Sequence, residues 1–240
     1  MMRRSVSGES FRSSSPSQPT YSEISAKHYL RNSKVTIDFA PPTEDASVVP
    51  LSLSEQNIIL FTRGNRVHYK NMSTNEDIGQ LCRVPEKWGS LRSMSCAGKD
   101  QPNVAALGTE KGIQLWDLST KKVMSSWTTR EVTAMHWNGP VLTVGGVKGT
   151  IRHFDTRTKE TPTMKEQAMK VTRHQAKIMR LQWNVDGNIL ASGDASGTVY
   201  CWDSRQKVPL DVGEFVQRRK KMQHPGAITV RFSIRGQNRY

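Results

Sequence analysis

A short pattern that occurs three times along the chain constrains its fold more than any other feature. Residues 104–117, 141–155 and 189–203 each contain an apolar stretch, a glycine-rich turn, and a second stretch that closes on an aromatic residue followed by aspartate. Glycine accepts the positive φ of a tight turn between antiparallel strands, so each copy predicts a β-hairpin. The three closing pairs are Trp116-Asp117, Phe154-Asp155 and Trp202-Asp203.

A weaker copy of the same pattern occupies residues 58–71, and we take Tyr69-Lys70 as its closing pair. The four closing aromatics then lie 47, 38 and 48 residues apart. A repeat of about 40–45 residues with four strands is typical of WD-type β-propeller blades. Residues 132–137 and 178–183 alternate apolar and polar side chains, which predicts an inner strand before each hairpin, and residues 123–127 predict an outer strand. We therefore predict an all-β WD-repeat β-propeller with about four blades.

The ends of the chain differ from the repeat region in composition. The first 34 residues are rich in Ser, Pro and Arg and poor in aliphatic side chains, so they cannot bury enough apolar surface to fold. They contain no apolar stretch of the length that a secretory signal needs, and the chain has no apolar run long enough to span a bilayer. We predict a disordered tail over residues 1–37, the propeller over residues 38–230, and an atypical C-terminal tail over residues 231–240.

Charge and cysteine content restrict the classes of function. The formal net charge of +14 is concentrated at the ends, with +4 in residues 1–34 and +7 in residues 205–240. The densest basic run, Arg218–Lys221, leaves nucleic-acid binding as an alternative, although the repeat register places it on an exposed outer strand where charges discourage pairing with other sheets. The three cysteines have no CxxC spacing and the six histidines no metal-ligand spacing, so we predict no zinc site, disulfide framework or cofactor. No phosphate-cradling glycine loop is found either, and we do not expect an enzyme.

Residues of the last repeat predict a buried structural network. His174, Ser192 and Trp202 stand where WD blades often carry a hydrogen-bonded set of His, Ser or Thr, and Trp, and Ser196 stands where the Asp of that set is usual. A His, a Ser and a nearby Asp are also the components of a hydrolase triad, but the chain has no G-x-S-x-G motif, so we favour the structural role. Two further closing aromatics are assigned to the structural core of their blades: Trp116 and Phe154.

Three segments carry a resemblance to a known family. Ala40-Pro41 followed by Asp45 is similar to the family's lead-in to its first blade. Residues 132–146, VTAMHWNGPVLTVGG, resemble its third-blade strand pair, and residues 223–230 resemble the start of its fifth blade. The family is the fizzy family, the WD-repeat activators of the anaphase-promoting complex, a ubiquitin ligase. The resemblance covers about residues 38–230 and implies that the repeats are the first four blades of a seven-bladed ring.

The resemblance implies a role in selecting substrates for the ligase. Family members hold short degradation motifs of cell-cycle proteins and present them to the anaphase-promoting complex, in mitosis or meiosis and in the nucleus and cytoplasm. Asp45 matches the acidic residue that receives the basic residue of the destruction-box motif, and a carboxylate–Arg pair would orient such a motif. A solvated loop carboxylate beside Glu44 is the alternative. The expected partners are ligase subunits and degradation motifs, with no membrane and no small-molecule substrate.

The chain departs from the family at several positions. Ser52 stands where the family's second motif pocket has Asp, and Ala195 and Gly197 stand where it has Asn. The family's Asp-Arg-aromatic-Ile-Pro docking string and its C-terminal Ile-Arg tail are not found, the closest docking string being Lys27–Arg31. We therefore expect a truncated or diverged member, with a WD-repeat scaffold of another pathway or a non-functional fragment as alternatives.

Overall fold

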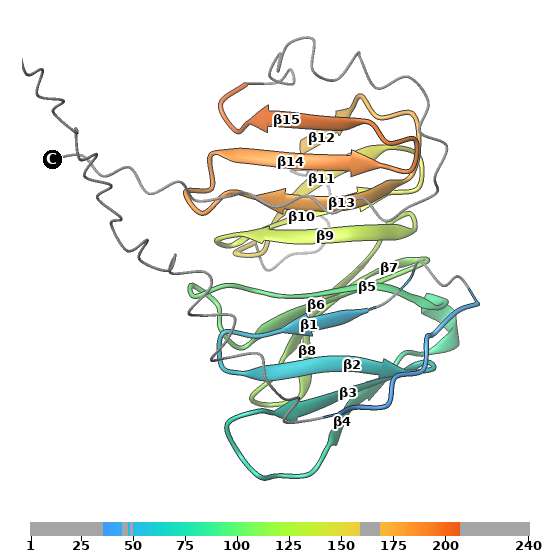
Figure 1. Ribbon diagram of the computed structural model, residues 1–240, viewed down its shortest axis with the longest axis vertical. Coiled ribbons are helices and arrows are strands. Elements are labelled where there is room, and N and C mark those ends of the chain that lie inside the picture. Colours follow the sequence, from blue (N-terminus) through green and yellow to red (C-terminus); the bar gives the residue numbers. More distant parts are fainter. Residues whose placement is uncertain (1–35, 45–47, 49, 159–168, 207–240) are drawn as a thin grey trace, which may run out of the picture. The chain divides into compact units, whose positions relative to one another are not determined.

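The described secondary structure is almost entirely antiparallel β-sheet (Figure 1). The computed structural model describes residues 36–44, 48, 50–158 and 169–206. By its contacts the chain divides into two units, Met1–Asp38 and Phe39–Tyr240, and every described strand lies in the second. Within the described ranges the only helical element is the 3₁₀ turn Glu86–Trp88, and no helix is long and apolar enough to cross a membrane. The predicted all-β class is confirmed, whereas residues 1–35 of the predicted N-terminal tail, the predicted C-terminal tail and the Arg218–Lys221 run lie outside the described residues.

The first two sheets are four-stranded meanders in chain order. Sheet 1 consists of β1 (Leu51–Leu53), β2 (Ile58–Arg63), β3 (Arg66–Asn71) and β4 (Gly79–Arg83). Sheet 2 consists of β5 (Leu91–Cys96), β6 (Val104–Thr109), β7 (Gly112–Asp117) and β8 (Lys122–Thr128). The predicted outer strand of the second repeat is β8, which pairs with β7.

The last two sheets repeat this arrangement. Sheet 3 consists of β9 (Val132–Asn138), β10 (Val141–Gly146), β11 (Thr150–Asp155) and β12 (Met169–Thr172). Sheet 4 has three described strands, β13 (Ile178–Trp183), β14 (Ile189–Asp194) and β15 (Val199–Asp203). Strands β9 and β13 lie where the alternating patterns predict them, each ahead of its hairpin.

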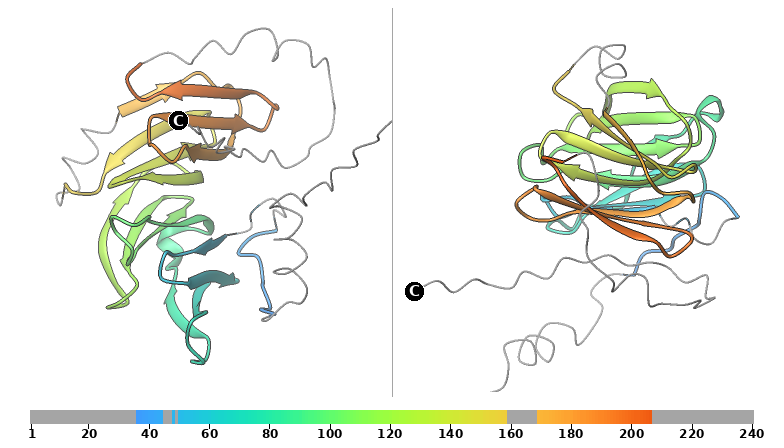
Figure 2. Two further views of the ribbon diagram at one scale, coloured as in Figure 1. Left: turned by 60° about the vertical axis from the view of Figure 1, so that its left-hand side comes forward. Right: turned by 90° about the horizontal axis from the view of Figure 1, so that it is seen from above.

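The sheets follow one another through their first strands. Strand β1 contacts β5, β5 contacts β9, and β9 contacts β13, so the sheets stack face to face in chain order within the second unit (Figure 2). An apolar cluster lies in each of the three interfaces and supplies the main stabilising term of the fold. Among the described residues the four sheets do not close into a ring, as expected for four blades of a larger propeller.

Backbone pairing gives the four repeats one common register. In each sheet the amide that follows the closing pair donates to the carbonyl of the residue before the second strand, at N···O distances of 2.7 to 3.0 Å. The four donor–acceptor pairs are Met72 to Asn57, Leu118 to Asn103, Thr156 to Pro140, and Ser204 to Asn188. Positions in different sheets can therefore be matched residue by residue.

This register corrects the closing pair of sheet 1. Lys70 and Asn71 occupy the closing positions there, so the sequence-based assignment of Tyr69-Lys70 was wrong by one residue. Asn71 Oδ1 accepts the amide of Ser73 at 2.9 Å, the same turn that the closing aspartates of the other sheets make with the residue two further on. The turn needs only a side-chain oxygen at that position, so Asn replaces Asp while the aromatic is absent.

The repeated spacing of glycines in the hairpins has two causes. The sequence predicts one of them, the positive φ of a tight turn. The second glycine of the later hairpins does adopt a positive φ, 68° at Gly149 and 90° at Gly197. The first glycine instead allows the next sheet to approach. A Cβ on Gly108 would lie 2.5 Å from Val132 Cγ1, and one on Gly145 would lie 2.5 Å from Ile178 Cγ2. Gly108 and Gly145 thus each receive the leading residue of the next sheet's inner strand.

Candidate functional site

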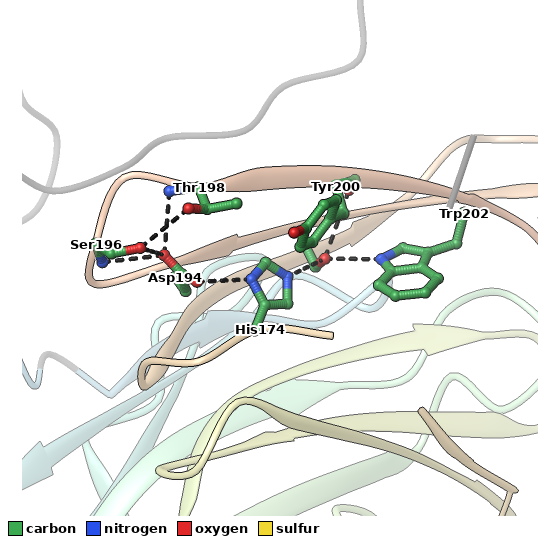
Figure 3. Close-up of polar contacts among 7 residues, drawn as sticks. His174, Asp194, Ser196, Thr198, Tyr200 and Trp202 are labelled. Atoms are coloured by element: carbon green, nitrogen blue, oxygen red, sulfur yellow. Dashed lines mark hydrogen bonds and ion pairs between the residues drawn. The ribbon is translucent and has the colours of Figure 1, made fainter. Parts of the chain in front are cut away.

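The polar side chains predicted for the last repeat form one hydrogen-bonded chain in sheet 4 (Figure 3). Trp202 Nε1 donates to Ser192 Oγ at 2.8 Å, and Ser192 Oγ lies 2.7 Å from His174 Nε2. His174 Nδ1 lies 2.8 Å from Asp194 Oδ2. An indole only donates and a carboxylate only accepts, so a neutral His174 carries its proton on Nδ1 and accepts the Ser192 hydroxyl proton at Nε2.

The carboxylate of this network comes from Asp194. The repeat pattern places the usual Asp two residues later, at Ser196. The second oxygen of Asp194, Oδ1, accepts the Ser196 amide at 3.0 Å, the Thr198 amide at 3.1 Å and the Ser196 hydroxyl at 2.5 Å. Burial alone would raise the pKa of Asp194, but the hydrogen bonds from Ser196, His174 and Thr198 outweigh it and hold the pKa below its ordinary value. The carboxylate therefore stays charged and ties the β14–β15 turn to His174.

Burial decides between the structural and the catalytic interpretation of this set. Ser192 is 0% exposed, and the side chains of His174 and Asp194 are 0% and 1% exposed. The indole of Trp202 already occupies an acceptor site of the Ser192 oxygen that a nucleophile would use. A substrate carbonyl cannot reach this hydroxyl without opening the sheet. The network can hold sheet 4 together and position its turn, but it cannot act as a hydrolase triad.

The closing aromatics of sheets 2 and 3 have no such network. Trp116 Nε1 donates to Gln114 Oε1 at 3.2 Å, and Phe154 is 1% exposed with its ring centroid 5.3 Å from that of Trp127. The register explains the difference, because the position of Ser192 is taken by Leu107 in sheet 2 and by Val144 in sheet 3. Because neither sheet has a hydroxyl at that position, Phe154 is held by packing and Trp116 bonds to Gln114 on its own strand.

A second polar link, which sequence reasoning missed, connects sheets 3 and 4. Thr143 Oγ1 lies 2.9 Å from His153 Nδ1 and accepts the indole N–H of Trp183, from β13 of the next sheet, at 2.9 Å. Burial lowers the pKa of His153 to about 4, so its imidazole is neutral at pH 7. No motif marks these residues, since they come from three strands and two repeats; only the paired register brings them together.

Asp45, the predicted contact for the basic residue of a destruction box, lies outside the described residues and stays a prediction. The segment ahead of it is attached to sheet 1, where Ala40 pairs in parallel with Arg63 at the end of β2. Ser52, which stands at the family's acidic position, accepts the backbone amide of Cys96 at 2.9 Å and so links β1 to β5. Gly197 stands in the turn between β14 and β15 beside exposed Ala195 and presents no side chain there.

The inner strands surround a small cavity of about 140 Å³. Arg92 from β5 lies at its wall, with Nη2 2.7 Å from Glu110 Oε1 and Nε 3.3 Å from Glu131 Oε1. The two carboxylates share the Arg92 guanidinium and largely neutralise its charge. The ion pair with Glu131 joins sheet 2 to the start of sheet 3. Pockets for drug-sized ligands measure about 300–1,000 Å³, so this cavity can hold one side chain and not a cofactor.

Comparison with known proteins finds one WD repeat in the chain and similarity to WD-repeat proteins. The family model WD40, described as WD domain, G-beta repeat, matches residues 165–203. Meiotic fizzy-related protein 1 of Schizosaccharomyces pombe is 39% identical over 44% of this chain and 24% of its own length. Anaphase-promoting complex subunit cdc20 of Dictyostelium discoideum is 31% identical over 64% of this chain and 30% of its own length. The chain thus spans less than a third of either curated relative.

A solved structure supports the fold independently. A chain in the crystal structure of the mitotic checkpoint complex superposes with a TM-score of 0.61 at 20% identity, covering 74% of this chain and 58% of that chain. The sheet order and the WD40 match agree with that superposition. The predicted resemblance to the fizzy family is confirmed, over a region that folds as successive WD-repeat blades.

Proposed function

We propose that this chain is an adaptor of the anaphase-promoting complex, acting as an activator that selects cell-cycle proteins for ubiquitination. The observation that carries the proposal is the 31% identity, over 64% of the chain, to a protein named as an anaphase-promoting complex subunit. The similarity to a fizzy-related protein supports it. A WD-repeat scaffold of another pathway is the competing function, because WD blades as such are not specific to one partner.

The arrangement of the sheets suits binding rather than chemistry. The one Ser–His–Asp set among the described residues is closed to substrate, and its atoms are committed to holding the β14–β15 turn. Rigid sheets that carry their variable turns at the edges are a common support for partner recognition. In this proposal the four sheets position turns and inter-sheet surfaces against the ligase and its substrates.

Affinity purification of the tagged full chain from dividing cells tests the proposal. Subunits of the anaphase-promoting complex should be recovered with the wild type. A matched control is Gly145→Val, which keeps the net charge of +14 but drives side-chain atoms into Ile178 and disrupts the packing of sheets 3 and 4. Recovery that survives this variant reflects charge alone. Other partners without any ligase subunit would favour the competing scaffold function.

The finer part of the proposal assigns Asp45 to the basic residue of a destruction-box motif. The Asp45→Asn variant should weaken binding of a synthetic destruction-box peptide by about tenfold or more, since a charge-assisted pair with Arg is lost. Glu44→Gln is the matched control, because it removes the neighbouring exposed charge and should leave the affinity unchanged. If both variants weaken binding equally, Asp45 contributes only to the overall negative charge of the segment and does not pair with the Arg.

By the same resemblance we propose that the protein acts in the nucleus and the cytoplasm. A fluorescent fusion of the full chain, followed through division, should be found in both compartments. Exclusive localisation to a membrane-bound organelle would contradict an adaptor of this ligase.

A further inference from the structure

The interface between sheets 2 and 3 is closed by one large side chain from an outer strand. Trp127 of β8 stands opposite Ile113 of β7 and is 2% exposed. Its indole packs on Phe154 of sheet 3, with ring centroids 5.3 Å apart and an interplanar angle of 50°. The sheets diverge away from their inner strands, and this Trp–Phe pair fills the wedge between them.

The same position in the next interface is occupied by a much smaller residue. Val171 of β12 stands opposite Ile151 of β11, as Trp127 stands opposite Ile113. Trp202 of sheet 4 corresponds to Phe154 of sheet 3, since each precedes the closing aspartate. A valine isopropyl group therefore replaces an indole, and the wedge between sheets 3 and 4 is not filled by the described side chains.

A cleft of about 680 Å³ is found at this place. Its walls include the aromatic side chains of Trp183 and Trp202 and the aliphatic side chains of Ile151, Val171 and Leu190. The two indoles are held in place, because Trp183 donates to Thr143 and Trp202 donates to Ser192. The cleft is therefore preformed, and its volume lies within the range of about 300–1,000 Å³ that is usual for ligand pockets.

The cleft is lined by three basic residues, Lys170, Arg173 and Arg205, and by two acidic residues, Asp155 and Asp203, which are paired with Arg157 and Arg205. Lys170 and Arg173, on and just after β12, are both exposed, and neither has an ion-pair partner among the described residues. Arg205 also lines the cleft, but its guanidinium lies 2.6 Å from Asp203 Oδ2. An apolar, aromatic-walled cleft beside the exposed Lys170 and Arg173 is complementary to an aromatic side chain flanked by carboxylates.

We propose that the cleft between sheets 3 and 4 binds a short segment of a partner protein that carries an aromatic side chain next to acidic residues. The aromatic ring occupies the place that the Trp127 indole takes in the preceding interface, against Trp202 and Trp183. The acidic residues pair with Lys170 and Arg173. The proposal makes no use of Asp45 and does not depend on the proposed link to the ubiquitin ligase.

A titration of the full chain with a fluorescein-labelled peptide, Glu-Asp-Phe-Asp-Glu, tests the proposal by fluorescence polarisation. The peptide should bind saturably, and the same peptide with Ala in place of Phe should bind about tenfold more weakly or worse, because the anchoring ring is lost. Val171→Trp fills the cleft and should weaken binding of the Phe peptide by a similar factor. Val123→Trp, at a 46% exposed position on β8, is the matched control and should leave binding unchanged.

Equal binding of the Phe and Ala peptides, or full binding to Val171→Trp, would overturn the proposal. If Val171→Trp does not fold, Lys170→Gln and Arg173→Gln test the proposal instead, because both residues are exposed. Each of these two changes should weaken binding of the Phe peptide several-fold. The chain itself contains an acid-flanked Phe at Glu214-Phe215, outside the described residues. If the peptide binds only to the Phe215→Ala variant, the cleft is occupied by the chain's own segment and a partner is not its ligand.

Discussion

The interface between sheets 2 and 3 and the interface between sheets 3 and 4 share one register but are closed in different ways. The first has an apolar cluster that contains Trp127 and Phe154, together with polar links from Trp137 to the Ser95 carbonyl and from Arg92 to Glu131. The second combines an apolar cluster with polar links, the bond from Trp183 to Thr143 being one of them, and it leaves a cleft beside Val171. The backbone of a repeat fixes where a residue stands, and the residue at one outer-strand position then decides whether an interface is sealed or open.

The largest expected effect comes from making the first interface resemble the second. Trp127→Val should lower the free energy of unfolding by about 3–4 kcal/mol, because a buried aromatic is lost and the rigid sheets cannot collapse onto the space. Urea unfolding of the purified full chain measures the effect. Val123→Ala, on the exposed side of the same strand, should change it by less than about 0.5 kcal/mol. A loss below about 1 kcal/mol for Trp127→Val would mean that the wedge is not a closed core.

The next effect concerns the polar network of sheet 4, which has no counterpart in sheet 3. Asp194→Ala leaves the buried His174 without its acceptor and releases the β14–β15 turn, so we expect a loss of about 2–3 kcal/mol. The exposed Asp186→Ala, from the same sheet, serves as the control and should be nearly neutral. If the two variants unfold at the same urea concentration, the network does not stabilise the sheet.

The polar link between sheets 3 and 4 predicts a dependence on pH. Burial lowers the pKa of His153 to about 4 and also lowers that of His136, so the unfolded chain binds protons more readily than the folded chain between about pH 4 and 6.5. The stabilisation is fully present above about pH 6.5 and is lost as the pH falls towards 4.

For His153 alone the loss between pH 7 and pH 5 should be about 2 kcal/mol. The comparison of wild type with His153→Gln, by urea unfolding at both pH values, isolates that contribution. Identical pH dependence of the two proteins would show that His153 does not titrate in this way.

The smallest expected effect fills the open interface. Val171→Trp should raise the free energy of unfolding by about 1 kcal/mol, as cavity-filling changes commonly do when the surroundings accept the side chain. Thermal unfolding of the full chain detects the increase as a higher midpoint. A destabilised variant would indicate that the walls formed by Trp183 and Trp202 leave no room for an indole.

The sequence predicted the hairpins, the inner strands and the set of His174, Ser192 and Trp202, because strand alternation and repeat spacing are local signals. It misassigned the closing pair of sheet 1, since Asn71 makes the turn without an aromatic neighbour. The repeat pattern indicated Ser196 as the position of the network's carboxylate. Matching positions between repeats does not show that Asp194, two residues earlier, reaches His174. The cleft was not predicted, because it depends on comparing Val171 with Trp127 through strand pairing that only the structure provides.

We propose above all that these WD-repeat sheets serve as an adaptor for the anaphase-promoting complex. Binding of the purified ligase to the immobilised full chain, followed by biolayer interferometry, tests it most directly. We predict saturable binding to the wild type, weakened in the sheet-disrupting Gly145→Val variant. No binding to the wild type, under conditions in which cdc20 of Dictyostelium discoideum binds, would contradict the claim.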